Sequence, residues 1–217
     1  MEHRFADRAE AGRALARHLD AYAGRHDVVV LGLPRGGVPV AFEVAKALGA
    51  PLDVLVVRKL GVPIQPELAM GAIASGDALY VDRQLQDETG VTEAEFARVL
   101  IQERAELARR EALYRPARPA LSVTGRTVIV VDDGMATGAT LRVAAQALRA
   151  NAPASIVAAL PVAPANAEHR LGDSVDAFVC AMKPHLFFSV GQFYADFSET
   201  ADDEVRDLLA RSRHDAR

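Results

Sequence analysis

Two adjacent carboxylates and a turn rich in glycine and threonine lie within one short stretch of the chain. The run from Val128 to Val131 is apolar, and Asp132 and Asp133 follow it directly. Four consecutive apolar residues are typical of a strand that is buried on both faces. The pattern therefore predicts a strand that carries two acids at its carboxyl end. The residues that follow the acids are Gly134, Met135, Ala136, Thr137, Gly138, Ala139 and Thr140.

The turn after the acids has the composition of an anion site. Gly134 and Gly138 allow backbone conformations and close approaches that a side chain would block. Backbone N–H groups of such a turn, together with the start of a following helix, form a cradle for an oxyanion. The hydroxyls of Thr137 and Thr140 can donate further hydrogen bonds to a phosphate. The two carboxylates would repel a phosphate but can accept from ribose hydroxyls, so the stretch predicts a sugar-phosphate site.

Other protein classes share parts of this pattern. Response-regulator receiver domains also have a strand that ends in two aspartates, but there it stands near the N-terminus and no Gly-Thr loop follows. A Walker phosphate loop needs a lysine after the last glycine, where this chain has Ala139. An ordinary strand-turn-helix connection is the remaining alternative.

The stretch from Val128 to Thr140 resembles the phosphoribosyl-pyrophosphate signature of type I phosphoribosyltransferases at every defining position. The resemblance implies that Asp132 and Asp133 are catalytic and bind the ribose 2′- and 3′-hydroxyls. It also implies that residues 134–140 bind substrate, with residues 135–140 holding the 5′-phosphate. The implied cofactor is Mg²⁺, bound through the substrate and through water to one of the two aspartates, with no direct side-chain ligand assigned.

A second glycine turn, Arg35-Gly36-Gly37, follows the apolar run from Val28 to Leu33. Its backbone amides could surround an oxyanion while the Arg35 guanidinium neutralises the charge. The turn resembles the pyrophosphate loop of the same enzymes. That resemblance implies a catalytic Arg35, substrate contacts at Gly36 and Gly37, and a cis peptide bond between Pro34 and Arg35.

Arg58 and Lys59 end the next predicted strand and lead into a stretch rich in glycine and proline. We expect this stretch, residues 61–76, to be a mobile or irregular loop. The pair resembles the Arg-Lys that precedes the flexible catalytic loop of several family members. This implies that Arg58 binds substrate and that Lys59 acts on the pyrophosphate. Two surface cations at a strand end are the alternative.

A segment dense in aromatic residues lies near the C-terminus, between Phe187 and Phe197. It resembles the segment with which purine phosphoribosyltransferases hold the base. The resemblance implies stacking on Phe187 or Phe188 and a backbone contact at Val190. The alternative, an aromatic core beneath a C-terminal helix, applies above all to Phe193 and Phe197.

The elements that position these residues alternate between short apolar runs and longer helical patterns. Such alternation predicts an α/β fold with a mainly parallel sheet flanked by helices, and ligands then bind at the carboxyl ends of the strands. It matches the type I phosphoribosyltransferase fold, with a flexible loop or hairpin and a small C-terminal hood. The predicted strands are 28–33, 52–57, 71–74, 78–81, 127–131, 156–162 and 177–181, and the predicted helices are 7–23, 38–48, 92–114 and 139–150.

We expect one domain over residues 1–217, with a helical insertion at about residues 83–120 and a hood at about residues 183–217. Thr92 and Glu95 have the spacing of a capping box and begin a long charged helix that reaches Tyr114. Its narrow apolar stripe predicts packing on the core edge or on a second subunit. A homodimer is therefore expected.

Charge and cysteine content exclude several classes of function. The net charge is −4, so no general field attracts nucleic acid or an anionic membrane. Cys180 is the single cysteine and excludes an internal disulfide. The apolar runs are too short to cross a bilayer, and the N-terminus has no apolar signal core. We expect a cytoplasmic protein without nucleic-acid or membrane partners.

The resemblance to type I phosphoribosyltransferases implies a pentosyltransferase of nucleotide metabolism. It would transfer the ribose 5-phosphate of phosphoribosyl pyrophosphate to a nucleobase-like acceptor and release pyrophosphate. The main alternative is a regulator that binds phosphoribosyl pyrophosphate or a nucleotide without turnover. A phosphoribosyl hydrolase or a phosphorylase-like enzyme would share the sugar site and differ in the acceptor.

Overall fold

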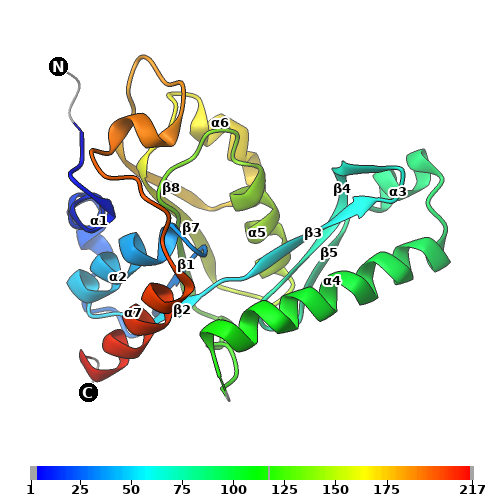
Figure 1. The fold of residues 1–217 in the computed structure, drawn as a ribbon, viewed down its shortest axis with the longest axis horizontal. Coiled ribbons are helices and arrows are strands. Elements are labelled where there is room, and N and C mark those ends of the chain that lie inside the picture. Colours follow the sequence, from blue (N-terminus) through cyan, green and yellow to red (C-terminus); the bar gives the residue numbers. More distant parts are fainter. Residues whose placement is uncertain (1–3, 117, 216–217) are drawn as a thin grey trace.

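The computed structural model describes residues 4–116 and 118–215. Its larger sheet has the strand order β2-β1-β6-β7-β8, and every neighbouring pair in it is parallel (Figure 1). The strands are β1 (Val28–Gly32), β2 (Leu52–Val54), β6 (Thr127–Val131), β7 (Ser155–Val162) and β8 (Ala177–Met182). All residues of β1, β2 and β6 are buried, as expected for strands that are covered on both faces. The predicted α/β fold with a mainly parallel sheet is confirmed.

Helices cover both faces of this sheet because alternate residues of each strand point to opposite sides. Val28 and Val30 pack in one apolar cluster with helices α1, α2 and α7. Val29 and Leu31 pack in another with helix α5. The helices are α1 (Arg8–Ala16), α2 (Gly37–Leu48), α5 (Ala139–Arg149), α6 (Ala167–Leu171) and α7 (Asp202–Asp215), with short 3₁₀ turns η1 (Asp20–Tyr22), η2 (Gly172–Ser174) and η3 (Val190–Phe193).

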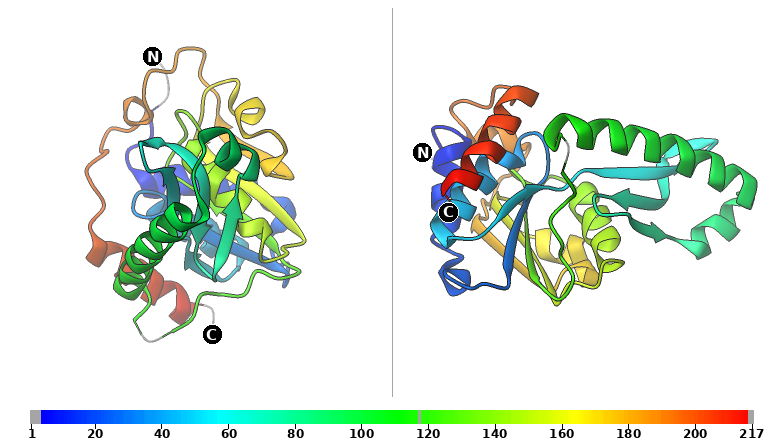
Figure 2. Two further views of the ribbon diagram at one scale, coloured as in Figure 1. Left: turned by 90° about the vertical axis from the view of Figure 1, so that its right-hand side faces the viewer. Right: turned by 90° about the horizontal axis from the view of Figure 1, so that it is seen from below.

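A second unit extends away from the parallel sheet, and we call residues 57–114 the arm (Figure 1). It contains the antiparallel strands β3 (Val57–Val62), β4 (Gln65–Ala74) and β5 (Ala78–Val81), followed by helices α3 (Arg83–Thr89) and α4 (Glu93–Tyr114). Helix α4 runs along the strands, and its C-terminal end lies beside α7 (Figure 2). The predicted capping box at its start is present, with Thr92 and Glu95 bonded to each other's backbone N–H groups.

Two predictions about the arm's strands were wrong. The strand expected over residues 52–57 is two strands, because the chain leaves the parallel sheet after Val54 and begins β3 at Val57. The stretch 61–76, expected to be irregular apart from a strand at 71–74, is mostly the long strand β4, whereas the predicted strands at 71–74 and 78–81 are confirmed and pair as a hairpin. Glycine and proline are accommodated there by a bulge at Gly61, where a Cβ atom would come within 2.5 Å of the Pro66 carbonyl oxygen.

The first helix is also shorter than predicted. It ends at Ala16 rather than near Ala23, and tighter turns follow, in which the N–H of His18 donates to Leu15 and that of Leu19 donates to Ala16. These turns bring the fully buried Leu19 into the core. Burial of one large side chain therefore outweighs the propensity of this stretch to continue as a helix.

A buried ionic network joins the base of the arm to the parallel sheet. The carboxylate of Asp53, in β2, is fully buried and accepts hydrogen bonds from Arg115, Arg118 and the N–H of Leu121, each at 3.0 Å. Arg115 also donates to the Ser75 hydroxyl at 2.9 Å, at the end of β4. The segment that returns from α4 to the sheet is thus fixed by charge-assisted hydrogen bonds.

Candidate functional site

The two adjacent acids lie at the carboxyl end of β6, in the middle of the parallel sheet. One oxygen of Asp132 accepts the N–H of Asp133 at 2.9 Å. Oδ2 of Asp133 receives both Nε and an Nη atom of Arg8, each at 2.9 Å. The hydroxyl of Tyr194 donates to the carbonyl oxygen of Asp133 at 2.5 Å. The N-terminal helix and the C-terminal segment therefore both meet this strand end.

Burial raises the pKa values of both acids. The pKa of Asp132 lies well above its usual value of 3.8, first because of burial and then because of the neighbouring charge of Asp133. Burial also raises the pKa of Asp133, and Arg8 partly offsets this. Asp132 has no directly bonded cation in the described part of the chain, so its ionised form is held at a cost in folding free energy.

Replacing Asp132 with asparagine is therefore expected to stabilise the fold. A raised folded-state pKa makes wild-type stability fall as the pH rises from the unfolded value near 3.8 toward the folded value. The variant lacks this loss, so its melting temperature should exceed the wild-type value by several degrees at about pH 8 and by much less at about pH 4. Thermal unfolding followed by circular dichroism at both pH values measures the difference. An equal melting temperature at the higher pH would contradict the expectation.

The loop that follows the acids encloses a cavity of about 120 Å³. This is smaller than the roughly 300 Å³ at which drug-sized pockets begin, and it suits a group such as a phosphate. Gly138 adopts φ +81°, in the left-handed region, immediately before α5 begins at Ala139. The residues that line the cavity are Asp132, Gly134, Met135, Ala136, Thr137, Gly138, Ala139, Thr140, Leu141 and Leu160.

Not every residue of this loop offers the same groups to a ligand. Met135 is buried, and its N–H already donates to the Val162 carbonyl oxygen at 3.1 Å. Thr137 and Thr140 are exposed, and both line the cavity. The threonine hydroxyls and the start of α5 are thus the available donors, while Met135 packs the loop onto the core.

The Arg35-Gly36-Gly37 turn contacts the two acids. The peptide bond between Pro34 and Arg35 is cis, as the resemblance implied. A Cβ atom on Gly37 would lie 2.7 Å from the Val131 carbonyl oxygen, and one on Gly36 would collide with the Asp133 carboxylate. The absence of side chains at these two positions therefore lets the turn pack directly against the end of β6.

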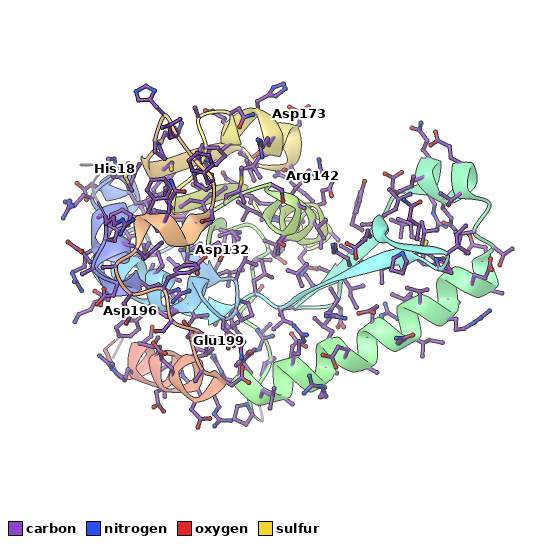
Figure 3. All side chains as sticks on the ribbon, turned by 45° about the horizontal axis from the view of Figure 1, so that its top comes forward. His18, Asp132, Arg142, Asp173, Asp196 and Glu199 are labelled. Atoms are coloured by element: carbon purple, nitrogen blue, oxygen red, sulfur yellow. The ribbon has the colours of Figure 1, made fainter. Side chains whose placement is uncertain are left out.

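Arg35 itself forms an ion pair with Glu199, in the segment before α7. Figure 3 shows Asp196 and Glu199 on the segment that runs past the end of the sheet where Asp132 lies. Both carboxylates also line a cavity of about 330 Å³ with Arg8, Pro39 and other residues. The guanidinium predicted to neutralise a pyrophosphate is thus held beside the site by an acid.

Arg58 and Lys59 lie in a different place. Both are on β3 and line a cavity of about 500 Å³ between the arm's strands and α4. Arg58 donates to Glu103 of α4 at 2.6 Å. Glu67 lines the same cavity, whereas none of the three lines the cavities at Asp132 or Glu199.

The aromatic segment is divided between core and surface. Val190 packs on the turn after the acids, since a Cβ atom on Gly134 would come within 2.5 Å of its side chain. Phe188 is 83% exposed, whereas Phe193 is buried and its ring centroid lies 5.5 Å from that of Phe187. Phe193 is thus a core residue, but it clusters with Ala11 and Ala14 of α1 and not beneath the C-terminal helix, and Phe197 is not buried. Phe197 lies under the guanidinium of Arg8, 4.2 Å from ring centroid to Cζ.

A family match decides the relationship of the chain to known proteins. Residues 5–183 match the family described as the phosphoribosyl transferase domain. The chain belongs to this phosphoribosyl transferase family. The match includes both glycine turns and the acidic pair of the site.

The phosphoribosyl transferase family relationship extends to individual proteins. Two curated relatives from Mycobacterium tuberculosis strains, each named provisionally as a phosphoribosyl transferase, are 48% identical over 211 residues and align with 97% of this chain. The chain spans about half the length of these relatives, 47% in each case. The crystal structure of TT1426 from Thermus thermophilus is 40% identical, with a TM-score of 0.86 over 96% of this chain and 98% of that one.

Three contacts of this phosphoribosyl transferase site were not predicted from sequence. They are Arg8 on Asp133, Tyr194 on the Asp133 carbonyl oxygen, and Glu199 on Arg35. Arg8 stands 125 residues from its partner and inside an ordinary capped helix start, so only a comparison of several chains could have singled it out. Among the described residues, no helix is long and apolar enough to span a bilayer, and no group of three or more metal-ligating side chains gathers.

Proposed function

We propose that the chain is a phosphoribosyltransferase that transfers the ribose 5-phosphate of phosphoribosyl pyrophosphate to a nucleobase-like acceptor and releases pyrophosphate. The observation that carries the proposal is the contact between the two anion-binding turns and the acidic pair. Gly36 and Gly37 touch Asp133 and Asp132, while Asp132 also lines the cavity of the phosphate loop. A phosphate cradle, acceptors for hydroxyls and a second anion-binding turn are thus adjacent. This order matches a ribose that carries a phosphate at one end and a diphosphate at the other.

In this proposal each part of the site has one task. The turn 134–140 and the start of α5 bind the 5′-phosphate, and the acidic pair accepts hydrogen bonds from the ribose hydroxyls. The Arg35-Gly36-Gly37 turn binds the diphosphate, after Arg35 exchanges Glu199 for the ligand. An acceptor nitrogen forms its bond to C1 as the bond from C1 to the pyrophosphate oxygen breaks, and the nitrogen's proton passes to solvent. The transition state resembles an oxocarbenium ion, so positioning and charge stabilisation supply most of the catalysis.

The residues present fit a magnesium ion that is held mainly by the substrate. Mg²⁺ in such sites takes one or two carboxylates with substrate phosphates and retained water, and Asp132 and Asp133 are the carboxylates at this strand end. When bound, the ion would neutralise charge on the leaving pyrophosphate. Asp132 suits the role better, because Oδ2 of Asp133 is taken by Arg8.

The second candidate function is a regulator that binds the same ligand without turnover. It is favoured by the ion pair between Glu199 and Arg35, the cation that is proposed to bind the diphosphate. A regulator could use this pair as its ligand-free state, and would bind phosphoribosyl pyrophosphate whether or not a base is present.

Pyrophosphate release from phosphoribosyl pyrophosphate and Mg²⁺, measured against a panel of purine and pyrimidine bases, tests the proposal. Release that depends on one base establishes the transferase and identifies its acceptor. Tight calorimetric binding of phosphoribosyl pyrophosphate with no release for any base supports the regulator instead. Absence of both binding and release contradicts the ribose-phosphate site.

Substitution of Gly37 with alanine is expected to separate the pyrophosphate turn from the acids. The added Cβ atom would lie 2.7 Å from the Val131 carbonyl oxygen and 2.9 Å from Asp132 Cα, and backbone atoms cannot rotate away. We expect a loss of stability of about 1–3 kcal/mol and a loss of phosphoribosyl pyrophosphate affinity of about tenfold or more. Calorimetric titration and thermal unfolding measure the two effects.

The control for this variant is Gly49→Ala, at the end of α2. Gly49 has φ +65° with no atom near its Cβ position, so alanine there is strained by about 1–2 kcal/mol but touches nothing. Gly49→Ala should lose stability but keep the wild-type affinity for phosphoribosyl pyrophosphate. Equal losses of affinity in both variants would show that Gly37 matters only for folding.

A further inference from the structure

Arg8 makes contacts to three separate groups around the acidic pair. Its Nε and one Nη atom donate to Oδ2 of Asp133, and its other Nη atom donates to the Ser198 carbonyl oxygen at 2.6 Å. Its guanidinium carbon lies 4.2 Å from the centre of the Phe197 ring. The guanidinium therefore uses its charge and donors on the Asp133 carboxylate and the Ser198 carbonyl oxygen, and its flat face on the Phe197 ring.

This arrangement differs from an ordinary surface ion pair. The side chains of Arg8 and Asp133 are only 12% and 16% exposed, whereas those of Arg13 and Glu43, from α1 and α2, are 55% and 20% exposed and 3.6 Å apart. Exposed pairs contribute little, but a partly buried and multiply bonded pair fixes its members in place. Arg8 and Arg13 thus offer a matched comparison on one helix.

The segment before Arg8 is joined to the C-terminal segment by backbone hydrogen bonds. Phe5 donates to the Phe193 carbonyl oxygen and accepts from the N–H of Ala195, each at 2.8 Å. The N–H of Asp196 donates to the Ala6 carbonyl oxygen at 2.9 Å. Residues 5–8 and 193–198 therefore form one unit, and Arg8 is the side chain that links this unit to the Asp133 carboxylate.

We infer that Arg8 is a positioning residue, which orients Asp133 for the ribose hydroxyls and connects the C-terminal segment to the ribose site. The inference rests on the proposed binding of phosphoribosyl pyrophosphate. Both hydrogen bonds from Arg8 to the carboxylate go to Oδ2, which leaves Oδ1 to accept from a ligand hydroxyl. Arg8 does not itself contact the reacting atoms in this scheme.

Calorimetric titration with two ligands tests the inference. Phosphoribosyl pyrophosphate and inorganic pyrophosphate, each with Mg²⁺, are titrated into the wild type, Arg8→Met, Arg8→Lys and Arg13→Met. We expect Arg8→Met to weaken phosphoribosyl pyrophosphate binding by about 10- to 100-fold, since both contacts that hold Asp133 Oδ2 are lost and the carboxylate no longer presents Oδ1 to the ribose. The affinity of Arg8→Lys should lie between those of the wild type and Arg8→Met, because lysine keeps the charge but not the two parallel donors of the guanidinium.

Inorganic pyrophosphate and Arg13→Met are the controls. Pyrophosphate does not need the ribose acids, so its affinity should be unchanged in every variant, and Arg13→Met should bind both ligands as the wild type does. Equal weakening of both ligands by Arg8→Met, or wild-type affinity for phosphoribosyl pyrophosphate in that variant, overturns the inference. Should Arg8→Met fail to fold, folded Arg8→Lys gives the same decision, because wild-type affinity for phosphoribosyl pyrophosphate in that variant overturns the inference as well.

The outcomes also separate this inference from the proposed function. If the wild type does not bind phosphoribosyl pyrophosphate, both are wrong. If the wild type binds it and Asp132→Asn/Asp133→Asn does not, while the Arg8 variants bind normally, only the role of Arg8 is wrong.

Discussion

Replacement of Asp132 and Asp133 together with asparagine is expected to weaken phosphoribosyl pyrophosphate binding by about 10²- to 10⁴-fold. Each carboxylate is proposed to accept a hydrogen bond from a ribose hydroxyl, and charge-assisted bonds contribute about 1.5–3 kcal/mol each. Asparagine keeps the size of each side chain and one acceptor oxygen but removes the charge. Calorimetric titration with the ligand and Mg²⁺ measures the loss.

The matched control is Asp87→Asn/Glu88→Gln, an adjacent acidic pair on α3 in the arm. Both residues are exposed. This double variant therefore removes the same formal charge from the arm and leaves the parallel sheet unchanged. It should bind as the wild type does. Wild-type affinity in the Asp132 and Asp133 variant would contradict the assignment of these acids to the ribose.

The second large effect is expected at the base of the arm, where Asp53→Ala should lower the free energy of unfolding by about 3–5 kcal/mol. Arg115 is 2% exposed and would keep only its ion pair with Glu111, which is less buried than Asp53, while Arg118 and the Leu121 N–H would lose their acceptor. For a chain of this size the melting temperature should fall by roughly 6–20 °C. Thermal and urea unfolding measure the change.

Asp27→Ala is the control for this effect. Asp27 also binds an arginine, Arg25, but both side chains are more than two-fifths exposed. Solvent screens such a pair, so stability should change little. Similar losses of unfolding free energy in Asp53→Ala and Asp27→Ala would mean that burial of the Asp53 network does not add to stability.

The part of the site that is local in sequence could be predicted, because one stretch of chain carries its own geometry. The strand, the acids, the glycine turn and the start of α5 follow each other between Thr127 and Ala139, and the structure places them in that order. The capping box at Thr92 is local in the same sense, whereas the cis bond before Arg35 was expected only from the resemblance to the pyrophosphate loop.

The part that depends on tertiary packing could not be predicted. Arg8 and Asp133 are 125 residues apart, and Tyr194 and Asp133 are 61 apart, so no spacing rule joins them. The arm shows a similar limit, because the part of it before the predicted strand 71–74, residues 61–70 with one glycine and two prolines, gives no strand pattern. Cross-strand hydrogen bonds and packing on α4 make it a strand pair nonetheless.

The separation in sequence between Arg8 and its partners bears on how the protein is made. The Phe197 ring and the Ser198 carbonyl oxygen that hold Arg8 leave the ribosome 189 and 190 residues after it. A nascent chain can form β1 and α2 long before that point, since domains begin to fold during synthesis. Arg8 acquires its complete set of partners only after Ser198 has been translated.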